Sequence, residues 1–284
     1  IDGGAPIVMR FRVDADPAIS PPVLSRTADR LLFMRLGGSG VGLLNFEHGG
    51  AAQSVAEAAG VNRSPSWSPD GRRLVFLSDR DGRRDLYIIG VSSGRMTRLT
   101  DTEARESEPS WSVMGGDVAF TQESPTGSSI WIVEPETGRT MKVIGEPGRN
   151  RSPAWSPDDK QLAYVSDREG SPDIWIAQVA DGKSRRLTTL PGAETHPTWS
   201  PDGKWIAFAA DQGGSSQIYK VAIEGGNPVR ITKDDPAGSV CLQPSWSPKN
   251  TWIVFTRMVG EMVDLCIAPP DSGKPFPAFK PQGM

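Results

Sequence analysis

The fold is decided by a stretch that the chain repeats. Residues 64–82 read SPSWSPDGRRLVFLSDRDG, and residues 196–214 read HPTWSPDGKWIAFAADQGG. Five tryptophans hold the position seen in these copies, spaced by 44, 44, 44 and 47 residues, each two residues after a proline and directly before a serine. A degenerate copy lies upstream, where Leu24 takes the tryptophan position 43 residues before Trp67. Chance does not produce this regularity, and a period of this length indicates a repeat architecture.

Each repeat resolves into four short strands, here called A to D. The segment around Trp67 predicts strand A, which the tight-turn sequence SPDG at 68–71 ends. An apolar run over 74–77 predicts strand B, and residues 86–91 predict strand C. A second turn then leads to strand D, RMTRLT at 95–100. No window shows helical periodicity over a full helix length.

Four antiparallel strands per repeat describe the blade of a β-propeller. The chain is therefore predicted to be all-β, a six-bladed propeller with four antiparallel strands in each blade. The blades are anchored at Leu24, Trp67, Trp111, Trp155, Trp199 and Trp246. All nine tryptophans fall on repeat positions, and we interpret them as blade core.

A propeller has to close its ring, because an open end leaves sheet edges unpaired. In the last repeat strand D would fall on residues 273–279 (GKPFPAF), whose two prolines make a poor ladder strand. The N-terminal residues 3–12 (GGAPIVMRFR) instead parallel residues 225–232 (GGNPVRIT), which hold a strand D position. We therefore expect residues 5–13 to form the outer strand of blade six and 270–284 to form a C-terminal tail. Residues 1–284 are then a single propeller domain.

The repeat resembles a known family. An SPxWSPDGxxIAF core followed by an IYxxxxxGGxxxRIT tail, as in residues 217–232, is similar to the PD40 (WD40-like) repeats of TolB-like propellers. The resemblance covers nearly the whole chain, without the α/β domain that precedes the propeller in TolB. It implies a non-enzymatic bacterial propeller that binds a protein or peptide in the periplasm or another extracytoplasmic setting, with partners among envelope proteins. Similar repeats also form propellers of prolyl-oligopeptidase-type peptidases and sensor proteins, so the motif specifies fold rather than function.

Composition narrows the function classes. A net charge of −3 gives no concentrated basic face for nucleic acid, and no stretch approaches 18 consecutive apolar residues, so no transmembrane segment is expected. The chain opens without a charged n-region or an apolar h-region, so we expect no signal peptide within it. Two cysteines and two histidines are too few for a disulfide framework or a histidine-rich metal cluster. We expect a monomer without a cofactor.

Loop chemistry points to one face of the ring. The A–B and C–D turns are short and uniform, whereas the D–A and B–C loops vary, and variable loops on a rigid scaffold commonly carry recognition. Strand A is innermost, so the residues that enter it should ring the mouth of the central channel. The candidate binding residues are Asn62, Arg63, Glu106, Glu108, Asn150, Arg151, Glu194, Thr195, His196 and Gln243. Arg63 and Arg151 hold equivalent positions and predict an acidic peptide or chain terminus as the guest.

Two alternative functions remain open. A hydrolase or lyase could have its active site at the same mouth, with His196 and the nearby glutamates as acid–base groups. No nucleophile or metal set completes such a site, and lyases among similar propellers hold a metal through several histidines. We therefore assign no catalytic residue and no metal ligand. The other alternative is the regulatory or sensor propeller of a larger peptidase or signalling protein.

Two short motifs suggest other chemistry. GVSSG at 90–94 matches the G-x-S-x-G nucleophile elbow, but it falls in a C–D turn, whereas the elbow requires a strand-to-helix turn. Asp79, Asp81 and Asp85 resemble part of a calcium loop but lack the distal glutamate of an EF-hand. Similar acidic spacing recurs at 167–173, which favours a turn motif of the blade. A structural calcium ion is the one cofactor that this spacing leaves open.

Overall fold

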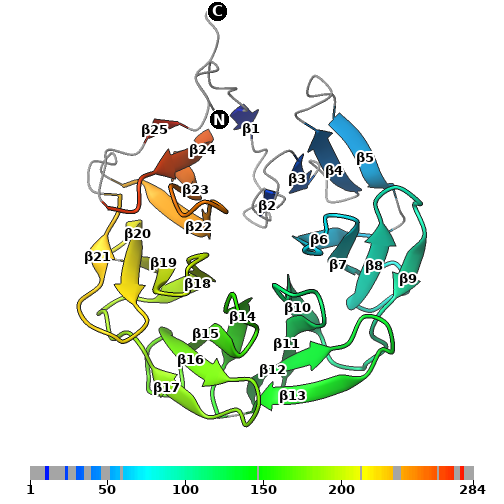
Figure 1. The fold of residues 1–284 in the computed structure, drawn as a ribbon, viewed down its shortest axis with the longest axis horizontal. Coiled ribbons are helices and arrows are strands. Elements are labelled where there is room, and N and C mark those ends of the chain that lie inside the picture. Colours follow the sequence, from blue (N-terminus) through cyan, green and yellow to red (C-terminus); the bar gives the residue numbers. More distant parts are fainter. Residues whose placement is uncertain are drawn as a thin grey trace, which may run out of the picture.

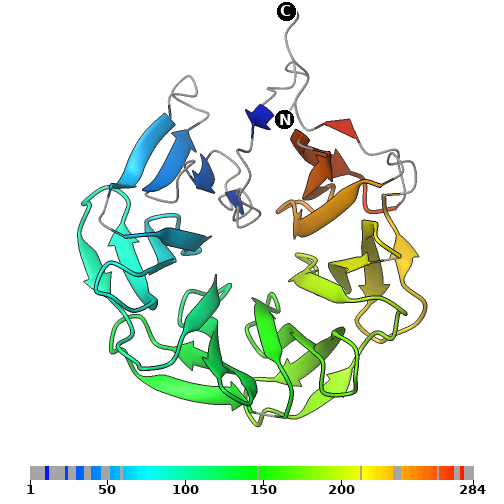
Figure 2. The same ribbon diagram turned by 180° about the vertical axis from the view of Figure 1, so that it is seen from behind.

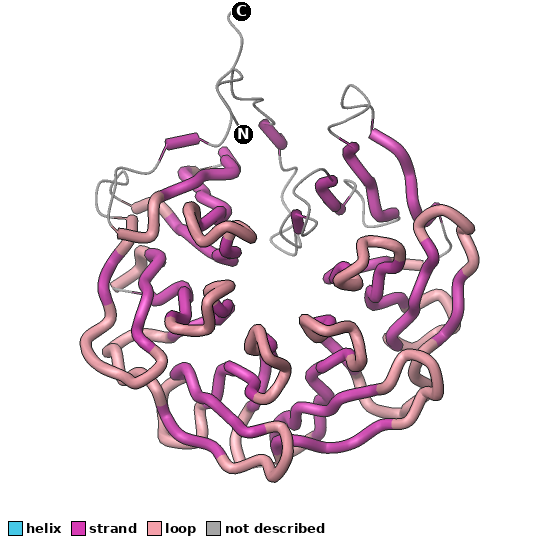
Figure 3. The backbone as a smooth tube through the Cα atoms, viewed as in Figure 1, coloured by secondary structure: helices cyan, strands magenta, loops and turns pink. Residues whose placement is uncertain are grey.

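The strands are arranged as a ring of small twisted sheets (Figures 1 and 2). The computed structural model describes residues 10–12, 23–24, 30–34, 40–45, 52–57, 60–145, 147–211, 213–232, 238–260, 262–271 and 276–277. Within these ranges strands alternate with turns and loops, and none of these residues is helical (Figure 3). None of the described segments is thus a helix able to cross a membrane. The all-β prediction is confirmed.

Five sheets in the described part of the chain are four-stranded, with strands in chain order from the axis of the ring outwards (Figure 1). All neighbouring strands run antiparallel. Blade one holds β2 (Val23–Leu24), β3 (Arg30–Met34), β4 (Gly40–Asn45) and β5 (Ala52–Glu57). Blade two holds β6 (Asn62–Trp67), β7 (Arg73–Ser78), β8 (Asp85–Gly90) and β9 (Met96–Arg98). Blade three holds β10 (Glu106–Trp111), β11 (Val118–Ser124), β12 (Gly127–Val133) and β13 (Thr140–Ile144). Blade four holds β14 (Asn150–Trp155), β15 (Gln161–Ser166), β16 (Asp173–Gln178) and β17 (Ser184–Arg186). Blade five holds β18 (Glu194–Trp199), β19 (Trp205–Asp211), β20 (Ser216–Ala222) and β21 (Val229–Arg230).

The remaining described sheet, here called the terminal sheet, has five strands. It holds β22 (Val240–Trp246), β23 (Ile253–Val259) and β24 (Met262–Ala268), and two short strands share the outer edge of β24. These are β1 (Arg10–Arg12), opposite residues 262–264, and β25 (Phe276–Pro277), opposite residues 266–267. The seven-residue edge of β24 is longer than either short strand, so both find room on it. Pro277 is tolerated because an edge strand needs no outward N–H.

The terminal sheet corrects two expectations. Over the residues that it describes, the structure shows five four-stranded blades where six were predicted, because the sixth sheet has five strands and both ends of the chain contribute to its outer edge. The expected outer strand 5–13 is present over residues 10–12, while 5–9 and 13 lie outside the described residues. Part of the expected tail 270–284 forms β25 instead of leaving the sheet.

The blades pack through strands that are buried on both faces. Side chains alternate along β7, so Leu74 and Phe76 pack with Trp67 inside blade two. Val75 and Leu77 point the other way and pack with Trp111 of blade three. From blade two to the terminal sheet the repeat thus builds a series of apolar layers, in which each blade covers the face of its neighbour.

The tryptophan anchors tie successive inner strands together. The anchors of blades two to five are only 5–8 % exposed. The indole N–H of Trp155 donates to the carbonyl of Ser110, and that of Trp199 donates to Ala154, both at 3.0 Å. The anchor of the terminal sheet, Trp246, is only partly buried. Trp252, at the end of the turn before β23, is 38 % exposed, so interpreting all nine tryptophans as core is wrong for it.

Strand A carries the same β-bulge in blades two to five and in the terminal sheet. The bulged residues have φ between 49° and 57° and are Ser64, Glu108, Ser152, His196 and Gln243. This left-handed conformation costs a residue with a side chain about 1–2 kcal/mol, and each of these residues precedes a proline, which restricts it further. The extra residue leaves two successive side chains partly exposed, where plain alternation would bury one.

Candidate functional site at the channel mouth

The inner strands β6, β10, β14, β18 and β22 surround the axis of the ring (Figure 1). Their first residues follow the D–A loops, and the B–C loops lie at the same end of the blades. We call this side the mouth face, and the side that carries the A–B and C–D turns the turn face. The ten predicted site residues all stand at the mouth-face end of an inner strand, but the structure divides them into two groups.

The first group is fully buried and lies between blades. It comprises the first residue of strand A in blades two to five: Asn62, Glu106, Asn150 and Glu194, each 0 % exposed. We call this the latch position. The prediction counted residues back from the anchor, and that count does not reveal that the bulge turns the first side chain of the strand inwards.

Glu106 fastens blade three to blade two. Its carboxylate accepts hydrogen bonds from the backbone N–H of Leu86 (3.2 Å), from the hydroxyl of Thr102 (3.1 Å) and from the hydroxyl of Thr100. Burial raises the pKa of Glu106 to about 7, although these hydrogen bonds act in the opposite direction. The carboxyl group is therefore part of a blade interface and titrates near neutral pH.

Glu194 repeats this arrangement between blades five and four. It accepts from the backbone N–H of Ile174 (3.1 Å), the backbone N–H of Leu190 (3.0 Å) and the hydroxyl of Thr188. Burial again raises the pKa, to about 7. The two glutamates differ in one partner, because a loop hydroxyl contacts Glu106 where a backbone N–H contacts Glu194.

Asparagine takes the latch position in the other two blades. The side-chain amide of Asn150 donates to the carbonyls of Ser128 and Gly145, both at 3.0 Å, and its oxygen accepts from Arg168 at 2.8 Å. In blade two, Asn62 accepts from Arg80 at 3.1 Å. In blades two to five the latch position therefore alternates between the neutral amide of asparagine and the titratable carboxyl group of glutamate.

The second group of predicted residues is partly exposed on the inner side of the ring: Arg63, Glu108, Arg151, Thr195, His196 and Gln243. Glu108 is the most firmly held of them. Its carboxylate accepts from the backbone N–H of Ser152 (2.6 Å), from the hydroxyl of Ser152 (2.8 Å) and from Thr121 (3.1 Å). Ser152 was not predicted, although it holds the same repeat position as Glu108 and His196, and that position was the available signal.

Three successive blades bring charge together around His196. Burial lowers the pKa of His196, while Glu108 of blade three raises it and Arg151 of blade four lowers it. The imidazole Nδ1 lies 3.0 Å from the hydroxyl of Thr195. We call Glu108, Arg151, Ser152, Thr195 and His196 the mouth cluster. Its acidic, basic and hydroxyl groups lie within electrostatic reach of one another.

Arg63 and Arg151 are uncommitted cations on the inner strands of this face. Among the described residues neither guanidinium forms an ion pair. By contrast, Arg98 and Arg186 are paired with the buried carboxylates of Asp85 (2.6 Å) and Asp173 (2.7 Å), respectively. A guanidinium that is not engaged within the protein offers its fork of N–H donors to a carboxylate from outside.

The mouth cluster does not contain an assembled nucleophile. The hydroxyl of Ser152 donates to Glu108, so the serine is not paired with His196 as nucleophilic catalysis requires. GVSSG at 90–94 lies in the turn after β8, as predicted, and the N–H of Gly94 donates to the carbonyl of Gly90.

Metal-binding donors are also scattered. In the part of the chain that the structure describes, no group of three or more His, Cys, Asp or Glu residues is placed to hold a metal ion. The aspartates that resemble a calcium loop have separate partners. Asp79 accepts from the N–H of Val61 (2.6 Å), Asp81 from the hydroxyl of Tyr87, and Asp85 pairs with Arg98.

Comparison with known proteins agrees with the geometry of the blades. The family model of the TolB β-propeller domain (PD40) matches residues 2–133 and 115–274. The structure of putative TolB from Agrobacterium tumefaciens superposes with a TM-score of 0.70 and 25 % identity, over 81 % of this chain and 84 % of that one.

Curated relatives match over shorter stretches. The Tol-Pal system protein TolB of Syntrophus aciditrophicus is 40 % identical over 45 residues, and the uncharacterized peptidase YuxL of Bacillus subtilis is 49 % identical over 51 residues. These stretches are 16 % and 17 % of this chain but only 10 % and 8 % of the relatives, so this chain matches a small part of either protein. Because the family model spans nearly the whole ring, this chain belongs to the TolB β-propeller family.

Proposed function

We propose that this protein is a binding propeller whose mouth face holds an acidic segment of a protein or peptide partner. The observation that carries the proposal is the placement of Arg63 and Arg151. They stand at the same repeat position in blades two and four, partly exposed beside the bulge of the inner strand. Neither is paired among the described residues, so both are available to a carboxylate that enters from the mouth face.

The backbone at the mouth supports a binding role. Glycine adopts the left-handed conformation without the steric cost, yet the five bulges hold serine, glutamate, serine, histidine and glutamine. Each of these side chains is kept at a cost in stability. Strain of this kind is characteristic of sites where the side chain serves recognition or chemistry. Five of the seven left-handed residues other than glycine in the described ranges lie on the inner rim of the ring, and the other two, Asp159 and Asn250, lie in A–B turns.

The mouth cluster gives the site polarity. Glu108 is fixed by Ser152 and Thr121, so it presents negative charge at a set position. A guest carboxylate is attracted to Arg63 and Arg151 and repelled from Glu108. An acidic guest thus binds in one orientation, with its N–H groups or cations on the side of Glu108 and His196.

The family relationship supplies the setting. Because TolB of the Tol-Pal system matches part of this chain, we place this protein outside the cytoplasm, with envelope proteins as partners. In this proposal the chain is a monomeric single domain. The terminal sheet acts as a sixth blade, which β1 closes on the outer edge of β24.

A second candidate is the regulatory propeller of a larger peptidase. The observation in its favour is the 49 % identity with peptidase YuxL over 51 residues. In that case the mouth face would admit a peptide substrate to a catalytic domain, and the mouth cluster would still contact the peptide.

The test uses fluorescein-labelled hexaglutamate and hexaglutamine and follows their binding by fluorescence anisotropy. Wild-type protein is expected to bind hexaglutamate and not hexaglutamine. The Arg63→Ala/Arg151→Ala double variant should bind hexaglutamate at least about tenfold more weakly, the usual loss at a binding hot spot. The matched control, Arg139→Ala/Lys160→Ala, removes two exposed cations from the turn face and should bind as wild type does. Equal weakening in both double variants would contradict the proposal.

A further inference from the structure

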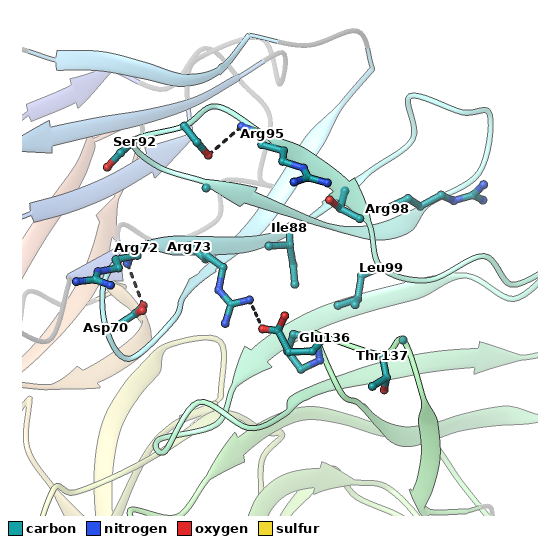
Figure 4. Close-up of a pocket in the computed structure, with 15 residues that line it drawn as sticks. Asp70, Arg72, Arg73, Ile88, Ser92, Arg95, Arg98, Leu99, Glu136 and Thr137 are labelled. Carbon is teal, nitrogen blue, oxygen red and sulfur yellow. Dashed lines mark hydrogen bonds and ion pairs between the residues drawn. The ribbon is translucent and has the colours of Figure 1, made fainter.

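A cleft opens on the turn face, between the outer parts of blades two and three. Its volume is about 910 Å³. One wall is formed by β8, β9 and the turn that joins them, and the other by the turn at 135–138 before β13 (Figure 4). Ile88 and Leu99 provide apolar surface between the walls. This volume lies within the range of small-molecule binding sites. Such sites combine apolar surface with a few polar groups, and the cleft has both.

The charge of the cleft is predominantly positive. Four arginines and two acidic residues line it. Arg73 reaches across the cleft to Glu136 at 2.6 Å, and the two charges offset each other (Figure 4). Arg98 points away and is paired with Asp85 outside the cleft.

Two cations in the cleft form no ion pair with another described residue, although the charge of Asp70 attracts one of them, Arg72. Arg72 comes from the A–B turn and Arg95 from the C–D turn; both are exposed. Neither guanidinium has an ion-pair partner within the described ranges. The carboxylate of Asp70 accepts from the N–H of Arg72 and from the hydroxyl of Ser68, so it is already engaged by blade two.

The corresponding interface between blades four and five shows why this cleft is open. Position 97 in blade two corresponds to position 185 in blade four, two repeats further along the chain. There the guanidinium of Arg185 donates to the backbone carbonyl of Ile223 on the neighbouring blade. In blade two the same position holds Thr97, which is too short to reach across. Gly90 likewise replaces the bulkier Gln178.

We propose that this cleft is a second binding site, for a small polyanion that carries carboxylate or phosphate groups. Arg72 and Arg95 hold the anionic groups, and the hydroxyl of Ser92 supplies a further donor. Ile88 and Leu99 contact the body of the ligand. The site faces away from the mouth cluster, so its ligand does not compete with a guest at the channel.

Isothermal titration calorimetry with pyrophosphate and with citrate tests the proposal. Wild-type protein is expected to bind at least one probe at a single site, and the preferred probe distinguishes a phosphate ligand from a carboxylate ligand. Arg95→Ala should weaken binding about tenfold or more, the usual effect of losing a charged hydrogen bond. Because Arg95 is exposed, this variant is expected to fold.

Two controls separate the cleft from general electrostatics and from the mouth. Arg139 holds the position of Arg95 one blade further on and does not line the cleft, so Arg139→Ala should bind the probe as wild type does. The Arg63→Ala/Arg151→Ala variant should also bind it unchanged, whatever happens to hexaglutamate. The proposal is overturned if neither probe binds, if Arg95→Ala binds as tightly as wild type, or if Arg139→Ala loses as much affinity as Arg95→Ala.

Discussion

The same substitution at the two glutamate latches should give opposite results. In Glu106→Gln the side-chain oxygen can accept from Leu86 and Thr100, while the new amide donates to the hydroxyl of Thr102. That hydroxyl is free to accept because it can donate to the carbonyl of Ala104, at 3.3 Å. The amide of Glu106→Gln is thus satisfied.

In Glu194→Gln no such arrangement exists. One carboxylate oxygen accepts from the N–H of Leu190 and the other from the N–H of Ile174. Whichever way the amide turns, its NH2 group faces a backbone N–H. A buried donor without an acceptor costs about 1–3 kcal/mol, so Glu194→Gln should be destabilised by that amount at pH 5, where both wild-type latches are protonated.

The pH dependence follows from the pKa values. The folded protein holds the proton of Glu106 more tightly than the unfolded chain does, because its pKa is about 7 instead of the ordinary 4.5. The stability that Glu106 contributes to the folded protein is therefore complete below about pH 4.5 and is lost as the pH rises through 7. The difference corresponds to about 3 kcal/mol. The Glu106→Gln variant has no such loss at this position. Its free energy of unfolding should therefore match that of wild type at pH 5 and exceed it by up to about 3 kcal/mol at pH 8.

Urea unfolding at pH 5 and pH 8, followed by tryptophan fluorescence, measures these differences. The Glu106→Gln variant retains only the second titrating latch, Glu194, so its loss of stability between the two pH values should be roughly half that of wild type. The reasoning is refuted if Glu106→Gln and Glu194→Gln have equal stabilities at pH 5. It is also refuted if Glu106→Gln loses as much stability as wild type on going to pH 8.

Three further changes test the packing of the ring. Trp155→Ala should cost about 3–5 kcal/mol in urea unfolding, because the indole is 5 % exposed and donates to Ser110; Trp246→Ala, at a partly exposed anchor, should cost less, and equal costs would contradict the burial seen here. Gln243→Gly should raise the melting temperature, because glycine relieves a φ of 57° that costs about 1–2 kcal/mol; a lower value would mean that the side chain stabilises the bulge. Removal of residues 1–13 should lower the melting temperature, because it exposes the edge of β24 that β1 covers; an unchanged value would show that β25 closes the sheet alone.

The order of strands could be predicted because each repeat carries its own turn signals. The SPDG turn after Trp67 and the apolar run behind it located β7 to within one residue at either end. The outer edge of the terminal sheet could be anticipated only in part. Which segment pairs with β24 depends on where both chain ends lie after the ring has formed, and no local pattern encodes that division.

The candidate site, too, could be predicted only in part from the local sequence. Counting from the anchors placed the ten candidate residues at the mouth-face ends of β6, β10, β14, β18 and β22. It did not show that Glu106 and Glu108 have different surroundings although they stand two residues apart. Regular alternation would put them on the same side. The bulge between them breaks the alternation. Its left-handed position holds serine or glutamate and not glycine, so the sequence gives no sign of the bulge. The turn-face cleft had a signal, the departure of RMTRLT at 95–100 from KSRRLT at 183–188, but its meaning depends on the neighbouring blade.

Because asparagine and glutamate alternate at the latch position, the interfaces between blades differ in their response to pH although the blades repeat every 44 residues. A ring of equivalent blades has no preferred place to open. Here the interfaces that contain Glu106 and Glu194 weaken as these two carboxyl groups lose their protons. The interface between blades three and four contains Asn150 and has no titrating latch. Alkaline conditions therefore loosen every second interface across this part of the ring and leave blades three and four joined. We therefore expect the segment that stays joined at alkaline pH to be the pair of blades three and four and not a single blade.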